Sequence, residues 1–440
     1  MSEPTQLPNE PVQRFSAPLQ RFLHIEAASG VVLLVAAAIA FIAANTGAAD
    51  AFLAFWKARI SFGIGSFEMD HSLKHWVSDG LMAIFFFVVG LEVKREMVLG
   101  ELRELRKAAL PIAAALGGMV VPAGIYLALL AGDPAARGWG IPMATDIAFV
   151  VGCMAVLGRR APTSLRVFLL SLAIADDIGA ILVIAIGYTE NLNLTALAIG
   201  GGGLALVFLF RRLGVRSLGA YGVVSLLVWV AFHESGVHAT IAGVILGVMT
   251  PTSSWVSDQR LDGITNRALE VWRGEGWPDF GSRRALLQRV QAAAREALSP
   301  LERLENALHP WSAFLIMPIF ALANAGVAFE MSRVTDPVAA AVAAGLVVGK
   351  PLGIVGFSFV AVRLGLASLP EGVGWGALLG GSFLAGIGFT MSLFIAGLAL
   401  DGPTLDAAKV GILGASLASG AIGMGLLYAV LPKDARGTAA

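Results

Sequence analysis

The feature that most constrains this chain is an apolar run, Ser164 to Tyr188, with two adjacent carboxylates, Asp176 and Asp177, at its middle. About twelve helical residues on either side, at about 1.5 Å each, place the pair roughly 18 Å from both ends, near the centre of a bilayer. An acidic residue at that depth costs on the order of 3 kcal/mol to insert, and a second one adds repulsion. The pair therefore requires a cation, a proton or both.

Apolar runs of spanning length recur along all 440 residues, of which 57% are hydrophobic and 14% charged. This composition indicates an all-α polytopic membrane protein whose surroundings are a lipid bilayer. The formal net charge is zero, which offers no basic surface for nucleic acid, and the single cysteine, Cys153, excludes an intrachain disulfide. The first twenty residues are polar and contain proline, so we expect no cleavable signal peptide.

We predict about twelve transmembrane helices, which divide into spans 1–8 within 23–250 and spans 9–12 within 310–431. With a cytoplasmic tail at 1–22 and alternating loops, the inside segments hold 24 of the 31 basic residues, the outside segments hold five, and two lie within spans. Such a bias predicts that both termini, including the tail 432–440, are cytoplasmic. The predicted spans are 23–46, 75–97, 107–130, 138–158, 164–188, 192–211, 218–235, 238–250, 311–330, 337–364, 376–399 and 406–431.

A long polar segment, 251–309, interrupts the spans and contains eight arginines and no lysine. Its stretch R-R-A-L-L-Q-R-V-Q-A-A-A-R-E-A-L places apolar residues on one side of a helix. We interpret the segment as a cytoplasmic linker with an amphipathic helix on the membrane surface, with a regulatory domain as the alternative.

The spans also contain an inverted-topology repeat. Spans three to five begin inside and spans ten to twelve begin outside, and the middle span of each triplet is interrupted, at A-T-D (144–146) and at G-I-G-F-T (386–390). Paired interruptions in inverted halves predict a transporter with two discontinuous crossing helices. Ordinary glycine packing is the alternative for the glycines of the second interruption alone.

Four ionisable residues fall near the middle of their spans: Asp146, Asp176, Asp177 and Lys350. A purely structural salt-bridge network is the alternative for each, but two neighbouring carboxylates in low dielectric repel each other. Oxygen ligands suit a small hard cation such as Na⁺ or Li⁺ and do not exclude K⁺. A cation and protons would then compete for one site. If that site is open to only one side of the membrane at a time, the competition becomes exchange of the cation for protons across the membrane. We expect Lys350 to pair with Asp176, and Asp146 to offset the positive helix ends at the interruptions.

The motif H-E-S-G-V-H (233–238) is similar to a zinc-protease motif, but its histidines are five residues apart and do not share a helical face. We therefore expect no zinc site there and expect His238 to cap or pack the eighth span. An enzyme would need a nucleophile and base or a metal set, which these motifs do not contain.

Several strings together resemble the NhaA family of bacterial sodium/proton antiporters. They cover the chain from about 23 to 431 and are A-T-D-I-A-F (144–149), L-A-I-A-D-D-I-G-A-I (172–181), G-V-H-A-T-I-A-G-V (236–244), L-H-P-W (308–311), N-A-G-V (324–327), G-K-P-L-G (349–353) and G-I-G-F-T-M-S-L-F-I (386–395).

The resemblance implies a secondary active transporter in the bacterial inner membrane. It implies no cofactor, and the substrates are Na⁺ or Li⁺, and H⁺. It implies electrogenic exchange that contributes to pH and sodium homeostasis, and a homodimer whose contact includes a hairpin within 47–74. Asp176 and Asp177 would bind the cation and the proton. The residues implied to balance charge or to lie at the broken helices are Asp146, Thr145, Lys350 and Thr390.

The resemblance also implies activation by alkaline pH through a charged cytoplasmic entrance. The matching positions are Glu92, Arg95, Glu96, Glu305 and His309. The chain departs from the family pattern at Asn306, where a histidine is expected, so the pH threshold does not carry over. A sodium-coupled symporter of an organic anion on a related fold is the alternative function, although such a carrier would show more polar residues around a wider cavity.

Overall fold

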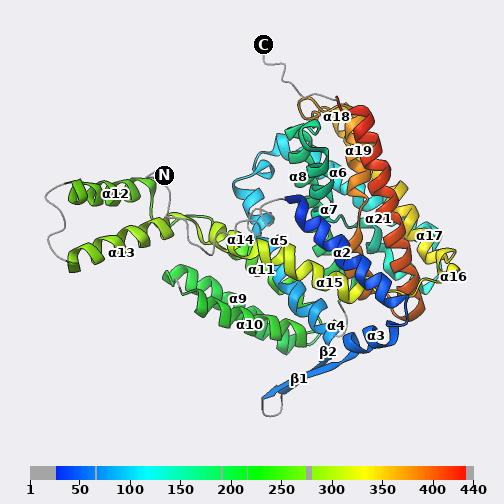
Figure 1. Cartoon of the computed structure of the whole chain (residues 1–440), viewed down its shortest axis with the longest axis horizontal. Coiled ribbons are helices and arrows are strands. Elements are labelled where there is room, and N and C mark those ends of the chain that lie inside the picture. Colours follow the sequence, from blue (N-terminus) through cyan, green and yellow to red (C-terminus); the bar gives the residue numbers. More distant parts are fainter. Residues whose placement is uncertain (1–25, 65–66, 190–191, 216, 274–279, 433–440) are drawn as a thin grey trace.

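The computed structural model describes residues 26–64, 67–189, 192–215, 217–273 and 280–432. The tail predicted at 1–22 and all but the first residue of the tail predicted at 432–440 lie outside the described residues. The described chain is mostly helical and includes one small sheet of two strands (Figure 1).

The regular elements follow one another as a series of helices that includes short 3-10 or π segments, here labelled η. In chain order they are α2 (Glu26–Ala44), α3 (Ala49–Lys57), β1 (Arg59–Ile64), β2 (Phe67–Ser72), α4 (Leu73–His75), η1 (Trp76–Leu81), α5 (Met82–Val98), η2 (Glu101–Arg103), α6 (Leu105–Leu129), η3 (Pro134–Met143), α7 (Ile147–Leu157), η4 (Gly158–Arg160), α8 (Thr163–Gly187), α9 (Leu194–Leu213), α10 (Leu218–Glu234), α11 (Ala239–Met249), α12 (Asp258–Arg273), α13 (Phe280–Ala297), α14 (Pro300–Trp311), η5 (Ser312–Ile316), α15 (Met317–Asn324), α16 (Met331–Val334), α17 (Pro337–Ala344), η6 (Gly345–Gly349), α18 (Lys350–Arg363), α19 (Trp375–Ala385), α20 (Phe389–Ala399) and α21 (Gly402–Val430).

Each of the twelve predicted spans coincides with an apolar helix or helix pair. Among the described residues, eight helices are long and apolar enough to cross a membrane, or up to ten if each of two bent pairs is one span. Two shorter apolar helices, Gly219–Glu234 and Ala239–Met249, occupy the seventh and eighth predicted spans. The predicted fold class is therefore confirmed.

The helix ends have local causes in the sequence. Asn193 accepts hydrogen bonds from the amides of Thr195 and Ala196 and so begins α9. Ser299 and Glu302 form a reciprocal capping box at the start of α14. These caps supply acceptors to amides that have no partner within the helix.

Close helix crossings depend on glycine. A Cβ atom at Gly117 of α6 would overlap the carbonyl group of Gly353 of α18, and a Cβ at Gly353 would overlap the carbonyl of Gly117. The absence of both side chains lets the two backbones touch. This contact holds α18, which begins at Lys350, against α6, the helix that precedes the broken span formed by η3 and α7.

The segment before the second span contains the small sheet. Strands β1 and β2 pair antiparallel, from Arg59 with Ser72 to Ile64 with Phe67. The exposed ion pair between Arg59 and Asp70, at 2.8 Å, bridges the two strands. A hairpin within 47–74, as implied by the family resemblance, is therefore present.

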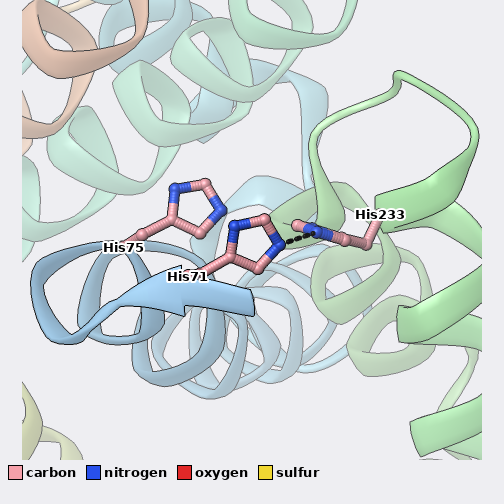
Figure 2. A group of neighbouring side chains, drawn as sticks. All are labelled: His71, His75 and His233. Carbon is pink, nitrogen blue, oxygen red and sulfur yellow. Dashed lines mark hydrogen bonds between the residues drawn. The ribbon is translucent and has the colours of Figure 1, made fainter. Parts of the chain in front are cut away.

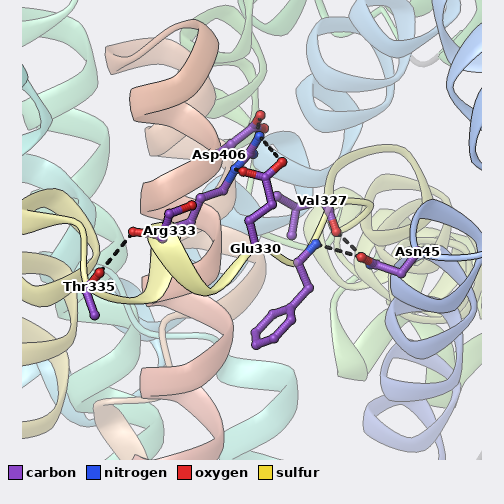
Figure 3. A network of polar contacts seen from close by, with 8 residues as sticks. Asn45, Val327, Glu330, Arg333, Thr335 and Asp406 are labelled. Atoms are coloured by element: carbon purple, nitrogen blue, oxygen red, sulfur yellow. Dashed lines mark hydrogen bonds and ion pairs between the residues drawn. The ribbon is translucent and has the colours of Figure 1, made fainter.

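A polar network joins the end of α2 to the segment between α15 and α17 (Figure 3). The side-chain amide of Asn45 donates to the carbonyl of Val327 at 2.8 Å, and its oxygen accepts from the amide of Phe329 at 2.6 Å. Arg333 forms an ion pair with Asp406 of α21 at 2.6 Å. The network therefore links three segments that are separate in sequence: the end of α2, the segment between α15 and α17, and α21.

The predicted amphipathic segment is more helical than the sequence suggested. Helices α12 and α13 pack together and project from the rest of the helices, with α14 leading back to the body (Figure 1). The backbone amides of Trp255 and Val256 donate to the carbonyl of Glu296, which ties the beginning of this excursion to its end. Whether the segment contacts a membrane stays a prediction.

Candidate functional site

The two interruptions meet inside the protein. The first separates η3 from α7 at residues 144–146, and the second separates α19 from α20 at residues 386–388, where the helix axis bends by 46°. The amide of Asp146 donates to the carbonyl of Ile387 at 2.7 Å, so the two backbones touch at the breaks. Four helix ends, each with backbone groups that have no hydrogen-bond partner within their own helix, thus converge on one buried region.

Asp146 lies between the two amino-terminal ends. Its side chain accepts hydrogen bonds from the amide of Phe149 in α7, at 3.4 Å, and from the amide of Thr390 in α20, at 3.1 Å. The hydroxyl of Thr390 also donates to Asp146. One buried carboxylate therefore caps both helices and faces both positive dipole ends, as expected from the sequence.

The two carboxyl-terminal ends have donors as partners. The ammonium of Lys350 donates to the carbonyl of Met143, the last residue of η3. The hydroxyl of Thr145 lies 2.9 Å from the carbonyl of Ala385, the last residue of α19. A cation and a hydroxyl therefore satisfy the negative ends of the two helices.

Asp176, in the middle of α8, joins this arrangement from a third helix. Its Oδ2 lies 2.9 Å from Nζ of Lys350 and 2.7 Å from the hydroxyl of Thr145, and Asp176 and Lys350 are 1% and 0% exposed. The predicted pairing of Lys350 with Asp176 is present. Within the described ranges, Oδ1 of Asp176 is buried and has no hydrogen-bond partner, so this oxygen has an acceptor lone pair available.

Asp177 is also buried, at 2% exposure, and interacts electrostatically with Asp176, Asp146, Lys350 and Glu92. If ionised, the three aspartates and the one lysine leave two uncompensated negative charges in this region. Such an excess is costly in a low-dielectric interior. The site therefore favours uptake of small cations or protons next to Asp176 and Asp177.

The five residues predicted at the charged entrance do not form one cluster. Arg95 on α5 forms an ion pair with Glu305 on α14, and Glu92 interacts electrostatically with both. Glu96 instead accepts a hydrogen bond from Ser171 of α8 at 3.3 Å. His309 is exposed on α14, one turn after Glu305. Because Glu92 also interacts with Asp177, it connects this charged group with the buried site.

Some partners at the site were missed by sequence reasoning. The carbonyl groups of Met143, Ala385 and Ile387 accept the hydrogen bonds that join the interruptions. Every residue has such a carbonyl group, so residue identity carries no signal for them. Ser171 could have been noticed as a polar residue in the apolar run of α8.

Crossed broken helices with buried opposite charges, set among helices of membrane-spanning length, define a membrane transporter of ions. A sequence model of the family described as Na⁺/H⁺ antiporter 1 matches residues 20–427, and the chain belongs to this family.

Similar proteins cover nearly the whole chain. The Na⁺/H⁺ antiporter NhaA of Rhodopirellula baltica is 54% identical over 430 residues, which is 98% of each chain. The Na⁺/H⁺ antiporter NhaA of Rhizobium meliloti is 54% identical over 419 residues, covering 95% of this chain and 96% of its own. The solved sodium proton antiporter MjNhaP1 of Methanocaldococcus jannaschii covers 96% of this chain and 95% of its own, with 12% identity and a TM-score of 0.45, a likeness too weak to carry an argument.

Proposed function

We propose that this protein is an electrogenic antiporter that exports Na⁺ or Li⁺ in exchange for inward H⁺ by secondary active transport. It contributes to sodium and pH homeostasis in a bacterial inner membrane. The observation that carries the proposal is the burial of three aspartates with a single lysine at the crossing of the broken helices, in a chain of the Na⁺/H⁺ antiporter 1 family. The symporter alternative has no support from the relatives reported above, each of which is named as an antiporter.

In this proposal Asp177 is the principal cation ligand and Asp176 the second. Asp176 uses Oδ2 for Lys350 and Thr145, which leaves Oδ1 for an incoming ion. A cation that approaches Oδ1 competes with the Lys350 ammonium for the negative charge of Asp176. Cation binding therefore loosens the pair with Lys350, and cation release lets the pair form again.

Thr145 couples protonation of Asp176 to the broken helix. Its hydroxyl lies near two acceptors, Oδ2 of Asp176 and the carbonyl of Ala385, but has one proton to donate. When Asp176 is ionised, the two acceptors compete for this proton. When Asp176 carries a proton on Oδ2, Asp176 donates to Thr145, and Thr145 donates to Ala385. The contact at the end of α19 thus responds to the proton on Asp176.

The charged entrance is proposed as the source of pH control. Glu92 interacts with the Arg95–Glu305 ion pair on one side and with Asp177 on the other. A change in the charge of Glu92 therefore acts on both. Glu96 and His309 belong to the same proposal, as implied by the family resemblance. The proposed assembly is a homodimer with its termini in the cytoplasm and the β1–β2 hairpin at the dimer contact.

The test is sodium-induced proton movement in proteoliposomes that contain the pure protein and a pH-sensitive dye, from acidic to alkaline pH and with an imposed membrane potential. We expect Asp177→Asn to abolish exchange because it removes the principal ligand charge. Asp176→Asn is expected to reduce exchange strongly or remove its dependence on the potential. The matched control is Asp50→Asn, because Asp50 is exposed on α3. Wild-type rates in both site variants, or no proton movement with Na⁺, Li⁺ or K⁺, would refute the proposal.

A further inference from the structure

Three histidines from two distant parts of the sequence lie together at one end of the helix assembly (Figure 2). His71 is on β2, His75 is the last residue of α4, and His233 is near the end of α10. In the orientation predicted from the basic residues, this is the outer side of the membrane. The cluster is separate from the aspartates described above and does not enter the proposed transport step.

The ring nitrogens have a spacing that suits a metal ion. Nε2 of His71 and Nε2 of His233 are 3.1 Å apart, and one ring nitrogen from each of the three residues lies within 4.8 Å of the other two. In a tetrahedral zinc site, Zn–N bonds of about 2.0–2.1 Å place neighbouring nitrogens roughly 3.3 Å apart. The pair of His71 and His233 is therefore close to this spacing, and His75 needs only a small side-chain movement.

A carboxylate behind the histidines orients them. Oδ2 of Asp79 lies 3.5 Å from Nδ1 of His233 and 3.3 Å from Nε2 of His75. A proton on Nδ1 of His233 can face Asp79, which leaves the Nε2 lone pair for a metal ion. Trp229 stacks on His233 with ring centroids 5.7 Å apart, and this contact restricts the ring.

The cluster is not satisfied by its internal contacts. Among the described residues, Nε2 of His75 is buried and makes no hydrogen bond of normal geometry, although Oδ2 of Asp79 lies 3.3 Å from it. The rings of His71 and His75 stack at 4.3 Å, and the contact between the Nε2 atoms of His71 and His233 requires that at least one of them be unprotonated. Three partly buried imidazoles beside a carboxylate form a donor set typical of zinc and other first-row transition metals.

We propose that His71, His75 and His233 bind one Zn²⁺ ion or a chemically similar divalent transition metal ion, with Asp79 as the residue that orients the ligands. The ion would connect the β1–β2 hairpin to the end of α10. Imidazole ligands do not suit Na⁺ or Li⁺, so the site is distinct from the transported cation. A ring of three ligands leaves a fourth position for water.

The motif at 233–238 explains why this site was missed. His238 does not share this site with His233, because its Nε2 lies 2.9 Å from the carbonyl of Tyr188. His233 finds its partners 158 and 162 residues earlier in the chain, at His75 and His71. Only His71 and His75 have a spacing in sequence, i and i+4, that hints at a shared site.

The test uses the full-length protein in detergent, without a histidine tag and after treatment with a chelator. Zn²⁺ is titrated by calorimetry, and Co²⁺ is titrated with its visible absorption spectrum as the readout of coordination geometry. We expect one ion per chain and the strong visible bands of tetrahedral Co²⁺. His71→Gln and His233→Gln are expected to remove this binding, and Asp79→Asn to weaken it by about 10- to 100-fold. His309→Gln is the matched control, because His309 lies outside the cluster.

Size-exclusion profiles show whether each variant is folded, and the wild-type titration tests the proposal even if a variant is not. Absence of saturable binding in the wild type, or a Co²⁺ spectrum of octahedral type, would overturn the proposal. Binding that survives His71→Gln and His233→Gln together would assign the ion to another place. None of these measurements depends on transport, so their outcome is independent of the proposed antiport.

Discussion

The buried pair of Lys350 and Asp176 offers a quantitative test of the site. The changes are Lys350→Met, Asp176→Asn and the two together, each of which keeps a side chain of similar length or shape. Lys350 is fully buried, and its ammonium contacts Asp176 at 2.9 Å and the carbonyl of Met143. Asp176 has only Thr145 as a further side-chain hydrogen-bond partner that the structure shows.

Each single change leaves one buried member of the pair without the partner that it contacts. The loss of one partner from such a pair costs about 3–5 kcal/mol of folding free energy. The double change removes both charges, so its cost is smaller than the sum of the two single costs. Residues in direct contact show coupling energies of about 0.5–3 kcal/mol, and we expect about 2 kcal/mol or more here because both side chains are fully buried.

The assay is unfolding of the purified protein in mixed micelles by titration with SDS, followed by intrinsic fluorescence. Lys57→Met serves as the control, because Lys57 is exposed on α3 and its loss is expected to change stability by less than about 0.5 kcal/mol. Additivity of the two single changes within about 0.5 kcal/mol would show that Lys350 and Asp176 do not stabilise each other. That result would refute a stabilising charge interaction between Lys350 and Asp176.

Two further changes test how the helices are held together. Gly353→Ala should destabilise the protein by about 1–3 kcal/mol in the same SDS titration, because the added Cβ overlaps the carbonyl of Gly117. Its control, Gly356→Ala on the same helix, meets open space and should be neutral or stabilising. Asn45→Ala should cost about 1–3 kcal/mol, because it removes two hydrogen bonds to the segment after α15. Its control, Thr46→Ala, removes only a local contact, and equal stability of these two variants would contradict the role of the network.

The sequence predicted the spans because a bilayer requires long apolar segments and makes each buried charge conspicuous. The interruptions at 144–146 and 386–388 were visible for the same reason, since polar and flexible residues stand out inside apolar runs. The pairing of Lys350 with Asp176 followed from the shortage of positive charge in the predicted site. The ion pair between Lys350 and Asp176 in the structure agrees with this prediction, which used electrostatics alone.

Local helix geometry was less predictable. The first half of the first broken span, Pro134–Met143, is a 3-10 segment, and π segments occur at Trp76–Leu81, Ser312–Ile316 and Gly345–Gly349. These segments preserve the apolar character of a span, so hydropathy does not reveal them. Proline and glycine within Pro134–Met143 give the one clear local signal, because both weaken a regular α-helix.

By itself, the sequence determined the class of the protein, the position of its apolar helices and the expected need for a cation or protons at Asp176 and Asp177. Each follows from the energetics of apolar and charged groups in a membrane. The tertiary structure decided which groups meet. The carbonyls of Met143 and Ala385 have no distinctive residue type, and His71 and His233 are far apart in sequence. Contacts of this kind depend on how helices cross in space, which the order of residues along one chain does not display.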